Sequence, residues 1–225
     1  MKDDFVTCKT KATKGLLPRS FFLRDTCAVA QDLLGCWLVR IREGVRLSGV
    51  IVETEAYVGE KDLACHARAG LTPRTEVMYG MGGFSYVYFT YGMHWLLNVT
   101  TEKEGFPAAV LIRALEPQEG VTVMRVRRGV YDLRSLCSGP ARLAQALGIG
   151  KAENGLDLCS QRSGVWLEDG LKISREQIVS GPRVGISRTP EPWRSKPWRY
   201  FVQGNSFVSK DPTTSRKSRR QPASQ

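Results

Sequence analysis

Short apolar runs, broken by glycine, proline and charged residues, divide this chain into strand-sized pieces. Strands are predicted at residues 36–41, 47–57, 84–90, 95–100, 108–114, 164–173, 182–186 and 200–202. Tight turns join the three central runs, as in an antiparallel meander with a protruding hairpin. With 225 residues the chain can bury one good core. The pattern therefore predicts a single mixed α/β (α+β) domain built on an antiparallel sheet.

Two helical segments are predicted beside these strands. One covers residues 27–34, after the capping pair Asp25-Thr26. The other opens at Ser138-Gly139-Pro140 and closes at Gly148. The free backbone amides at its start could hold a phosphate together with Arg142, or the segment could be an ordinary capped helix.

The strand predicted at residues 47–57 carries polar groups at alternate positions. Glu53, Glu55 and Tyr57 share one face, because side chains two residues apart lie on the same side of a strand. This face could be the solvent-exposed side of the sheet, or it could line a functional site. In the second case Glu55 is the candidate general base, next to the flat ring of Tyr57.

The net charge of +11 and the pI of about 9.6 favour a polyanionic partner, most often nucleic acid. Residues 1–15 are predicted to form a flexible basic terminus, and residues 206–225 a disordered basic tail. Without residues 206–225 the net charge is still +7. The domain predicted at residues 16–205 is therefore basic by itself.

Six scattered cysteines and two histidines provide no closely spaced pairs of metal ligands, so neither a metal nor a cofactor is expected. The sequence shows no apolar signal segment and no run long enough to span a bilayer. We therefore expect an intracellular protein that associates with DNA and not with a membrane.

Four tyrosines have the chemistry of base recognition. Tyr91 precedes Gly92 at the predicted hairpin tip, where a large aromatic exposes apolar surface without any gain for folding. It could fill the gap left by a displaced base, or it could fold back on its own hairpin. Tyr57, Tyr86 and Tyr88 offer flat faces for stacking, worth roughly 1–3 kcal/mol per base. Tyrosines are also ordinary sheet residues, and this interpretation is favoured for Tyr86.

Other polar residues near these tyrosines could complete a base pocket. His66, in an irregular loop, could present a ring nitrogen or its backbone amide to a base, or it could be structural. Asn98 could read or obstruct a purine edge. Arg113 lies among apolar residues and needs an anionic partner, either Glu55 or a phosphate. His94, near the turn, is structural or faces DNA.

Five blocks of this sequence, in this order, closely resemble the alkyladenine (3-methyladenine) DNA glycosylase family: IVETEAY, TPRTEVMYG, SYVYFTYGMHWLLNV, AVLIRALEP and SGPARLAQALGI. The similarity extends from about Leu17 to Val202. It implies a monomeric domain with a barrel-like antiparallel sheet, flanking helices and a hairpin that inserts into damaged double-stranded DNA. It also implies excision of alkylated or deaminated purines without a metal or cofactor.

The resemblance implies residues that intercalate into DNA and residues that catalyse the reaction. Tyr91, with Met93 close by, looks like the tyrosine that intercalates at the vacated site. Glu55 looks like the residue that activates the water attacking C1′ of the deoxyribose, and Arg113 matches the arginine near it.

The resemblance also assigns the pocket. Tyr57, His66 and Tyr88 look like its walls, and Asn98 matches an asparagine that clashes with the 2-amino group of guanine. Asp157 loosely matches an acid that orients His66, and Tyr86 is a second candidate for support. The loop at residues 186–188 loosely matches a segment that contacts DNA.

The expected chemistry agrees with these residues. An N3- or N7-alkylated purine already carries positive charge, so it leaves easily once water reaches C1′, and tyrosine faces favour a cationic ring. A lyase would need an amine nucleophile, and the five blocks contain no lysine. The expected product is an abasic site without strand cleavage.

Two other functions remain open at this point. A non-catalytic DNA- or RNA-binding module could use the same hairpin and basic surface. A metal-dependent nuclease or phosphodiesterase could use Glu53, Glu55 and Asp62, although scattered acids and few histidines count against it.

Overall fold

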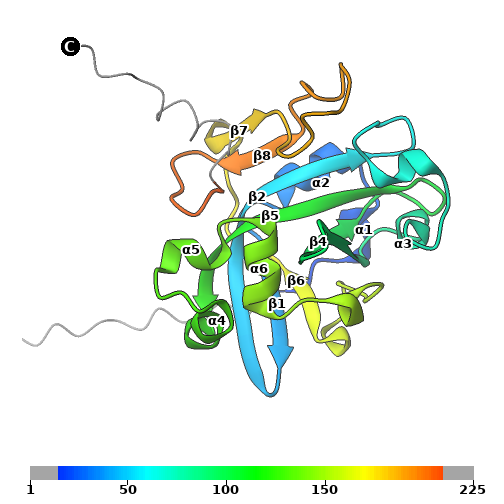
Figure 1. Cartoon of the computed structure of the whole chain (residues 1–225). Helices are drawn as coiled ribbons and strands as arrows, with labels where there is room; N and C mark the ends of the chain where they lie inside the picture. Colours follow the sequence, from blue (N-terminus) through cyan, green and yellow to red (C-terminus); the bar gives the residue numbers. More distant parts are fainter. Residues whose placement is uncertain (1–14, 210–225) are drawn as a thin grey trace, which may run out of the picture.

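The computed structural model describes residues 15–209, which form a mixed α/β domain with one large antiparallel sheet (Figure 1). Residues 1–14 and 210–225, which hold most of the two expected tails, lie outside the described residues.

The strands are β1 (Trp37–Arg42), β2 (Val45–Val58), β3 (Ser85–Thr90), β4 (His94–Thr100), β5 (Ala108–Glu119), β6 (Val165–Glu168), β7 (Ile178–Gly181) and β8 (Arg199–Val202). The α-helices are α1 (Arg19–Phe22), α2 (Thr26–Asp32), α3 (Glu76–Tyr79), α4 (Val121–Arg128), α5 (Leu133–Cys137) and α6 (Pro140–Leu147). The short 3-10 helices are η1 (His66–Ala69), η2 (Lys151–Glu153), η3 (Gln161–Ser163) and η4 (Arg175–Gln177).

The sheet is built around β2. The strand order is β3-β4-β5-β2-β1-β6, and β8 pairs with both β2 and β7. Along one edge of β2 runs β5, whereas the other edge is shared between β1 and, at Glu53 to Glu55, β8. The β2–β5 register shifts on both sides of Glu53. Such irregularities re-aim side chains and are frequent next to functional sites.

Helices cover both faces of this sheet. In Figure 1, α2 lies behind β2, and α6 lies in front of the sheet with α4 and α5. The hydroxyl of Thr54 donates to the carbonyl of Ala30 in α2 at 2.7 Å. Glu53 and Glu55, one residue before and after Thr54, therefore project to the opposite face, toward α6. The main apolar core packs between the layers and includes Val29, Leu33, Ile51, Ile112 and Leu147.

The sequence pattern correctly predicted strands β1 to β5 and β8 and helices α2 and α6, but it did not predict α1, α3, α5 or β7. The side chain of Asp25 caps α2 by accepting from the Ala28 amide at 2.8 Å. Helix α6 has Pro140 in its first turn and ends at Gly148, whose φ of 64° places it in the left-handed region typical of helix ends. The run at residues 121–128 is a helix, α4, which the pattern did not predict.

One strand prediction was wrong in part, and another was wrong. The run at residues 164–173 forms a strand only over Val165–Glu168. Residues 182–186 form an irregular loop after β7. The reason is Arg183, whose guanidinium lies in a buried ion pair with Asp62 and draws this loop inward.

The hairpin of β3 and β4 projects beyond the rest of the sheet. The two strands pair from Ser85↔Val99 out to Thr90↔His94, but β4 pairs with β5 only at Asn98, Val99 and Thr100. At the tip, Tyr91 and Gly92 have φ values of 51° and 67°. Positive φ at successive turn residues suits a hairpin, but it strains a bulky aromatic by about 1–3 kcal/mol. Such strain is typical of functional positions.

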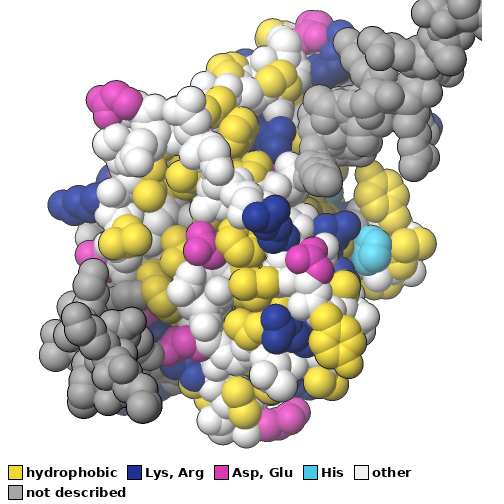
Figure 2. All heavy atoms as spheres, turned by 90° about the vertical axis from the view of Figure 1, so that its left-hand side faces the viewer, with side chains coloured by type: hydrophobic (Ala, Val, Ile, Leu, Met, Phe, Trp, Pro, Cys, Tyr) yellow, Lys and Arg dark blue, Asp and Glu magenta, His cyan; other side chains and the backbone are white. Residues whose placement is uncertain are grey.

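Across residues 15–209, no helix is both long enough and apolar enough to cross a bilayer. Figure 2, which views the side on which α4 and α5 lie, shows Lys and Arg side chains at several separate places among apolar and acidic ones.

Candidate active site

A cavity of about 310 Å³ lies between β2, the hairpin and the loop after β7, a size within the range of small-ligand pockets. The four residues expected in the base pocket line it together: Tyr57, His66, Tyr88 and Asn98. Arg113, expected in catalysis, and Tyr86, expected at most as support, line it as well. Tyr91 from the hairpin tip and Ile186 from the loop after β7 also line this cavity. The fold therefore gathers into one place residues that lie far apart in the sequence.

Several aromatic rings form part of the cavity walls. The rings of Tyr86 and Tyr88 lie 5.4 Å apart, and the ring of His66 stands edge-on to Tyr88 at 4.5 Å. On another side, the guanidinium of Arg183 stacks on Tyr57 at 4.7 Å from the ring centre. Such packing fixes the rings before any ligand enters.

The environment of His66 determines its protonation. Burial, followed by the nearby charges of Arg74 and Arg68, lowers the pKa of His66 to about 4, so the ring is neutral at pH 7. Nε2 lies 3.3 Å from a guanidinium nitrogen of Arg74, which can only donate. Nε2 must therefore accept, and Nδ1–H donates to the phenol oxygen of Tyr86 at 2.9 Å.

This geometry corrects one prediction. Asp157 does not orient His66: its carboxylate binds Arg19 at 2.6 Å and accepts from the Cys159 amide at 2.9 Å. Tyr86 is the residue that supports His66, although Tyr86 also packs as an ordinary sheet residue.

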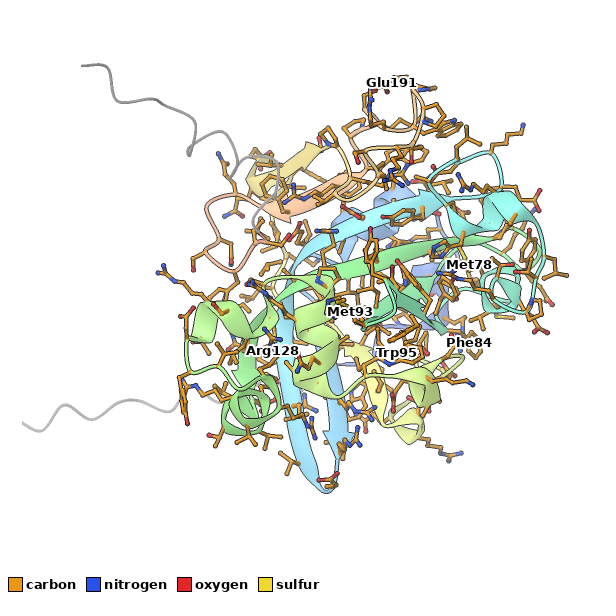
Figure 3. All side chains as sticks on the ribbon, in the orientation of Figure 1. Met78, Phe84, Met93, Trp95, Arg128 and Glu191 are labelled. Carbon is orange, nitrogen blue, oxygen red and sulfur yellow. The ribbon has the colours of Figure 1, made fainter. Side chains whose placement is uncertain are left out.

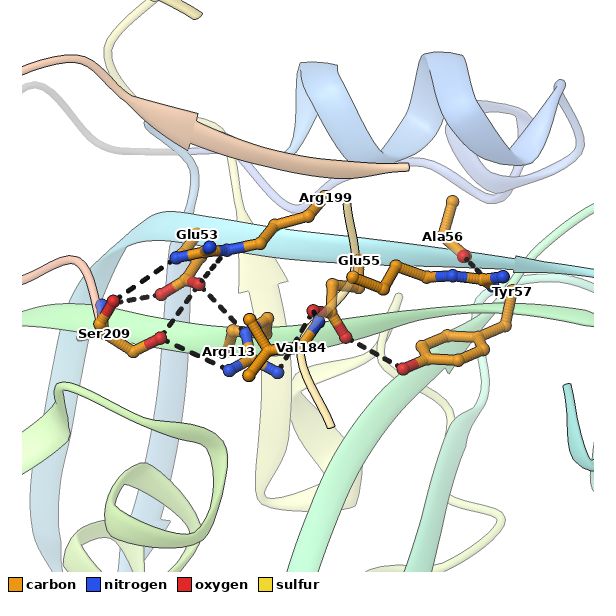
Figure 4. Close-up of polar contacts among 9 residues, drawn as sticks. Glu53, Glu55, Ala56, Tyr57, Arg113, Val184, Arg199 and Ser209 are labelled. Atoms are coloured by element: carbon orange, nitrogen blue, oxygen red, sulfur yellow. Dashed lines mark hydrogen bonds and ion pairs between the residues drawn. The ribbon is translucent and has the colours of Figure 1, made fainter. Parts of the chain in front are cut away.

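Glu55 lies directly behind the cavity wall and is completely buried. Its Oε2 accepts from the Tyr57 phenol at 2.8 Å, while Oε1 accepts from the Val184 amide at 2.6 Å and lies 3.2 Å from Nη1 of Arg113 (Figure 4). All three partners line the cavity. Burial, followed by the charge of Glu55, raises the pKa of Tyr57 well above its usual value, so its phenol stays protonated and donates.

Arg113 bridges two buried carboxylates. Its Nε donates to Glu53 at 2.9 Å, and its Nη1 faces Glu55 (Figure 4). Burial alone would lower the pKa of Arg113, but the charges of Glu55 and Glu53 outweigh burial and raise it above its usual value. Of the two partners considered for Arg113, Glu55 is therefore present, and Glu53 is a second one. The idea that this face is the wet side of the sheet is wrong.

A second buried ion pair holds the loop after β7. Arg183 binds Asp62 with two nitrogens, at 2.5 and 2.8 Å, and also donates to the Ala56 carbonyl at 2.9 Å. The next residue, Val184, thereby reaches Glu55 with its amide. Sequence reasoning missed this pair. The available signal was an arginine inside a short apolar run, as for Arg113.

Asn98 lies in the floor of the cavity, where it is almost fully buried. Its Nδ2 donates to the Tyr86 carbonyl of the partner strand at 2.9 Å. The amide is thus fixed by the sheet, with its oxygen as the remaining acceptor.

Both residues expected to enter DNA are exposed. Tyr91 and Met93, in the turn between β3 and β4, are 80% and 66% exposed. Met93 is labelled in Figure 3. Arg142 donates to the Ser138 hydroxyl at 2.9 Å in the first turns of α6, in a second, polar depression that shares Pro140 with the cavity. His94 is exposed at the start of β4.

The three acidic residues considered for a metal-dependent nuclease or phosphodiesterase form ion pairs with arginines. Glu53 and Glu55 contact Arg113, and Asp62 contacts Arg183. In the part of the chain that the structure describes, no group of three His, Cys, Asp or Glu side chains could hold a metal ion.

The chain is similar in sequence to a known protein family and to several of its named members. The family model described as methylpurine-DNA glycosylase (MPG) matches residues 20–206. A protein of Rhodopseudomonas palustris (strain BisB18), named "Putative 3-methyladenine DNA glycosylase", is 50% identical over 86% of this chain and 90% of its own length. Proteins of the same name from Chlorobaculum parvum and Methanocella arvoryzae are each 45% identical, over 91% and 87% of this chain and 96% of their own lengths. The chain therefore belongs to the methylpurine-DNA glycosylase family of DNA-repair hydrolases.

Proposed function

We propose that this protein is a monofunctional DNA glycosylase that flips alkylated or deaminated purines out of double-stranded DNA. It hydrolyses the N-glycosidic bond and leaves an abasic site. The observation that carries this proposal is the position of Glu55, a buried carboxylate immediately behind an aromatic cavity of base size. A monomer suffices, because one chain supplies the whole cavity.

Base flipping is favoured by the enclosure of the cavity. A base stacked in a duplex cannot lie between Tyr57, Tyr88 and His66, so the nucleotide must leave the stack first. Flipping costs a few kcal/mol, and stacking on an aromatic face returns roughly 1–3 kcal/mol. Tyr91 would fill the gap in the duplex, and its exposure and backbone strain at the hairpin tip support this role.

Glu55 is the proposed general base. A carboxylate accepts about four hydrogen bonds, and Tyr57 is the donor to Oε2, which can accept one more from a water molecule. As the water oxygen bonds to C1′, its proton passes to Glu55, and the base departs with the electrons of the broken bond. Because Glu55 is fully buried, one of its contacts at the cavity wall must loosen when the nucleotide enters.

The pocket chemistry favours cationic purines. An alkylated purine carries positive charge, so it needs no proton to leave, and electron-rich tyrosine faces attract it. The residues that line the cavity include no lysine, which supports hydrolysis rather than lyase chemistry. The amide of Asn98 would obstruct the 2-amino group of a normal guanine.

The proposal is tested with a labelled duplex that contains one hypoxanthine, incubated with excess protein and a chelator and then divided between hot alkali and no treatment. Strand breaks only after alkali are expected. Breaks without alkali would indicate a lyase or a nuclease. If neither lane breaks, a methylated duplex is tested next, and absence of base release there would leave a DNA-binding protein instead of an enzyme.

A further inference from the structure

We propose that Glu53 and Ser209 are positioning residues that set the orientation of Arg113 toward Glu55. This inference rests on the proposed function, in which Glu55 activates water. It adds to the active site a residue near the end of the chain, within the stretch that the sequence assigned to a disordered tail.

Glu53 is completely buried and accepts four hydrogen bonds (Figure 4). Oε1 accepts from Nε of Arg113 at 2.9 Å, from Nε of Arg199 at 2.7 Å and from the Ser209 hydroxyl at 2.9 Å. Oε2 accepts from the Ser209 backbone amide at 2.7 Å. A buried carboxylate with this many donors has little freedom to move.

Glu53 and Ser209 together hold the guanidinium of Arg113. Its Nε binds Glu53, its Nη2 donates to the Ser209 hydroxyl at 3.3 Å, and its Nη1 lies 3.2 Å from Glu55. A guanidinium is planar, so contacts at all three of its nitrogens fix both its position and the orientation of its plane. Glu55 therefore meets one nitrogen of Arg113 and not two.

This division of contacts matters for Glu55. If Glu53 lost its charge, Glu55 would be the nearest remaining carboxylate for Arg113. A bidentate pair between Arg113 and Glu55 would then be favoured, because bidentate arginine–carboxylate pairs are stronger than pairs with a single contact. Such a pair would occupy Oε2, the oxygen to which the proposed function assigns water. Glu53 thus keeps Arg113 from blocking Glu55.

Ser209 is held in place by Arg199 and by the chain segment that precedes it. Its carbonyl accepts from Nη2 of Arg199 at 3.3 Å. The preceding segment is attached to β5, because Asn205 donates to Glu116 at 3.0 Å and accepts from the Phe207 amide at 2.9 Å. Ser209 is 7% exposed. The segment at residues 205–208 therefore anchors Ser209 beside Glu53 and Arg113.

The test uses four variants of the full chain: Ser209→Ala, Ser209→Thr, Glu53→Gln and, as a matched control, Ser48→Ala. Ser48 is also a buried serine that donates to a glutamate on the sheet, Glu119, at 2.7 Å, but it lies outside the cavity. For each, the single-turnover rate of base release from a methylated duplex, the affinity for a duplex with an abasic-site analogue and the thermal unfolding temperature are measured.

We expect Ser209→Ala to lower the rate of base release roughly three- to tenfold at unchanged affinity. Ser209→Thr keeps the backbone amide and the hydroxyl that donate to Glu53, so its rate should be close to that of the wild type. Glu53→Gln should lower the rate roughly a hundredfold. Ser48→Ala should lower the unfolding temperature but not the rate. If Glu53→Gln does not fold, the serine variants decide.

A wild-type rate in Ser209→Ala, or an equal loss in Ser48→Ala, would overturn the inference while the proposed function stands. A wild-type chain that releases no base would overturn both.

Discussion

Tyr57 donates a 2.8 Å hydrogen bond to the carboxylate of Glu55, two residues earlier on the same face of β2. The ring of Tyr57 also forms a wall of the cavity, and Arg183 stacks on it. One side chain thus connects the expected site of the base with the residue expected to activate water.

The Tyr57→Phe variant separates these two roles. It keeps the aromatic wall and removes the donor to Glu55. Since a hydrogen bond to a charged group contributes about 1.5–3 kcal/mol, base release should slow by roughly ten- to a hundredfold while lesion binding stays near wild type. Single-turnover kinetics and a binding assay on the same duplex measure both. Equal losses in rate and affinity would mean that the phenol acts mainly in binding.

The Glu55→Gln variant keeps the shape of the side chain and removes its ability to take a proton. We expect base release to fall by roughly a hundredfold or more, with lesion DNA still bound. Glu176→Gln, at an exposed position outside the cavity, is the control. Retained turnover in Glu55→Gln would remove Glu55 from the mechanism. If neither the wild type nor the variant releases base while both bind DNA, the protein is a binding module.

The Tyr91→Ser variant tests the hairpin wedge. Loss of an inserted ring should weaken binding to lesion DNA roughly tenfold, because such stacking contributes roughly 1–3 kcal/mol. Tyr131→Ser is the matched control, since Tyr131 is 85% exposed and is not part of the cavity. Affinities are measured on lesion and normal duplexes, and only Tyr91→Ser should bind the lesion duplex more weakly than the wild type. Unchanged affinity would show that the tip does not insert.

The Asn98→Ser variant tests the discrimination of purines. The shorter side chain leaves room for the 2-amino group of guanine, so release of normal guanine should rise roughly tenfold. The rate is measured on undamaged duplex with excess protein. Because the variant also loses the hydrogen bond to the Tyr86 carbonyl, its thermal unfolding is measured alongside. An unaltered guanine rate in a folded variant would refute the role.

The stability of the protein should depend on pH through His66. Its pKa of about 4 in the folded state lies below the ordinary value of 6.5, so the unfolded chain takes up a proton first as the pH falls. The stability is therefore complete above pH 6.5 and is lost progressively toward pH 4. Between pH 7 and 4.5 the loss from His66 should be about 2 kcal/mol. Urea unfolding of the wild type and His66→Gln gives this value as the difference between their losses; equal losses would contradict it.

The sequence was sufficient for the elements whose signals are local. Alternation of apolar and polar residues identified the strands of the hairpin, and a proline and a glycine marked the two ends of α6. Matching blocks brought together Glu55, Tyr57 and Asn98, which the structure places around one cavity or directly behind it.

The remaining parts depend on contacts between distant segments. Arg183 reads as part of a short strand until its partner is known, because the ion pair with Asp62 joins residues 121 positions apart. Ser209 stands at the start of a basic, serine-rich run, and only its contact with Glu53, 156 positions away, shows that it is buried. No periodicity along the chain reports such a contact.

The attachment of the hairpin has a mechanical consequence. β4 pairs with β5 at Asn98, Val99 and Thr100, and Asn98 is the pair farthest out, where the hairpin leaves the sheet. Asn98 is also the floor of the cavity, and the same hairpin ends in Tyr91. In the proposed function, a purine that pressed against Asn98 would also press against the base of the hairpin that carries Tyr91. Rejection of an undamaged base and withdrawal of the tip from DNA would then be coupled in a single movement.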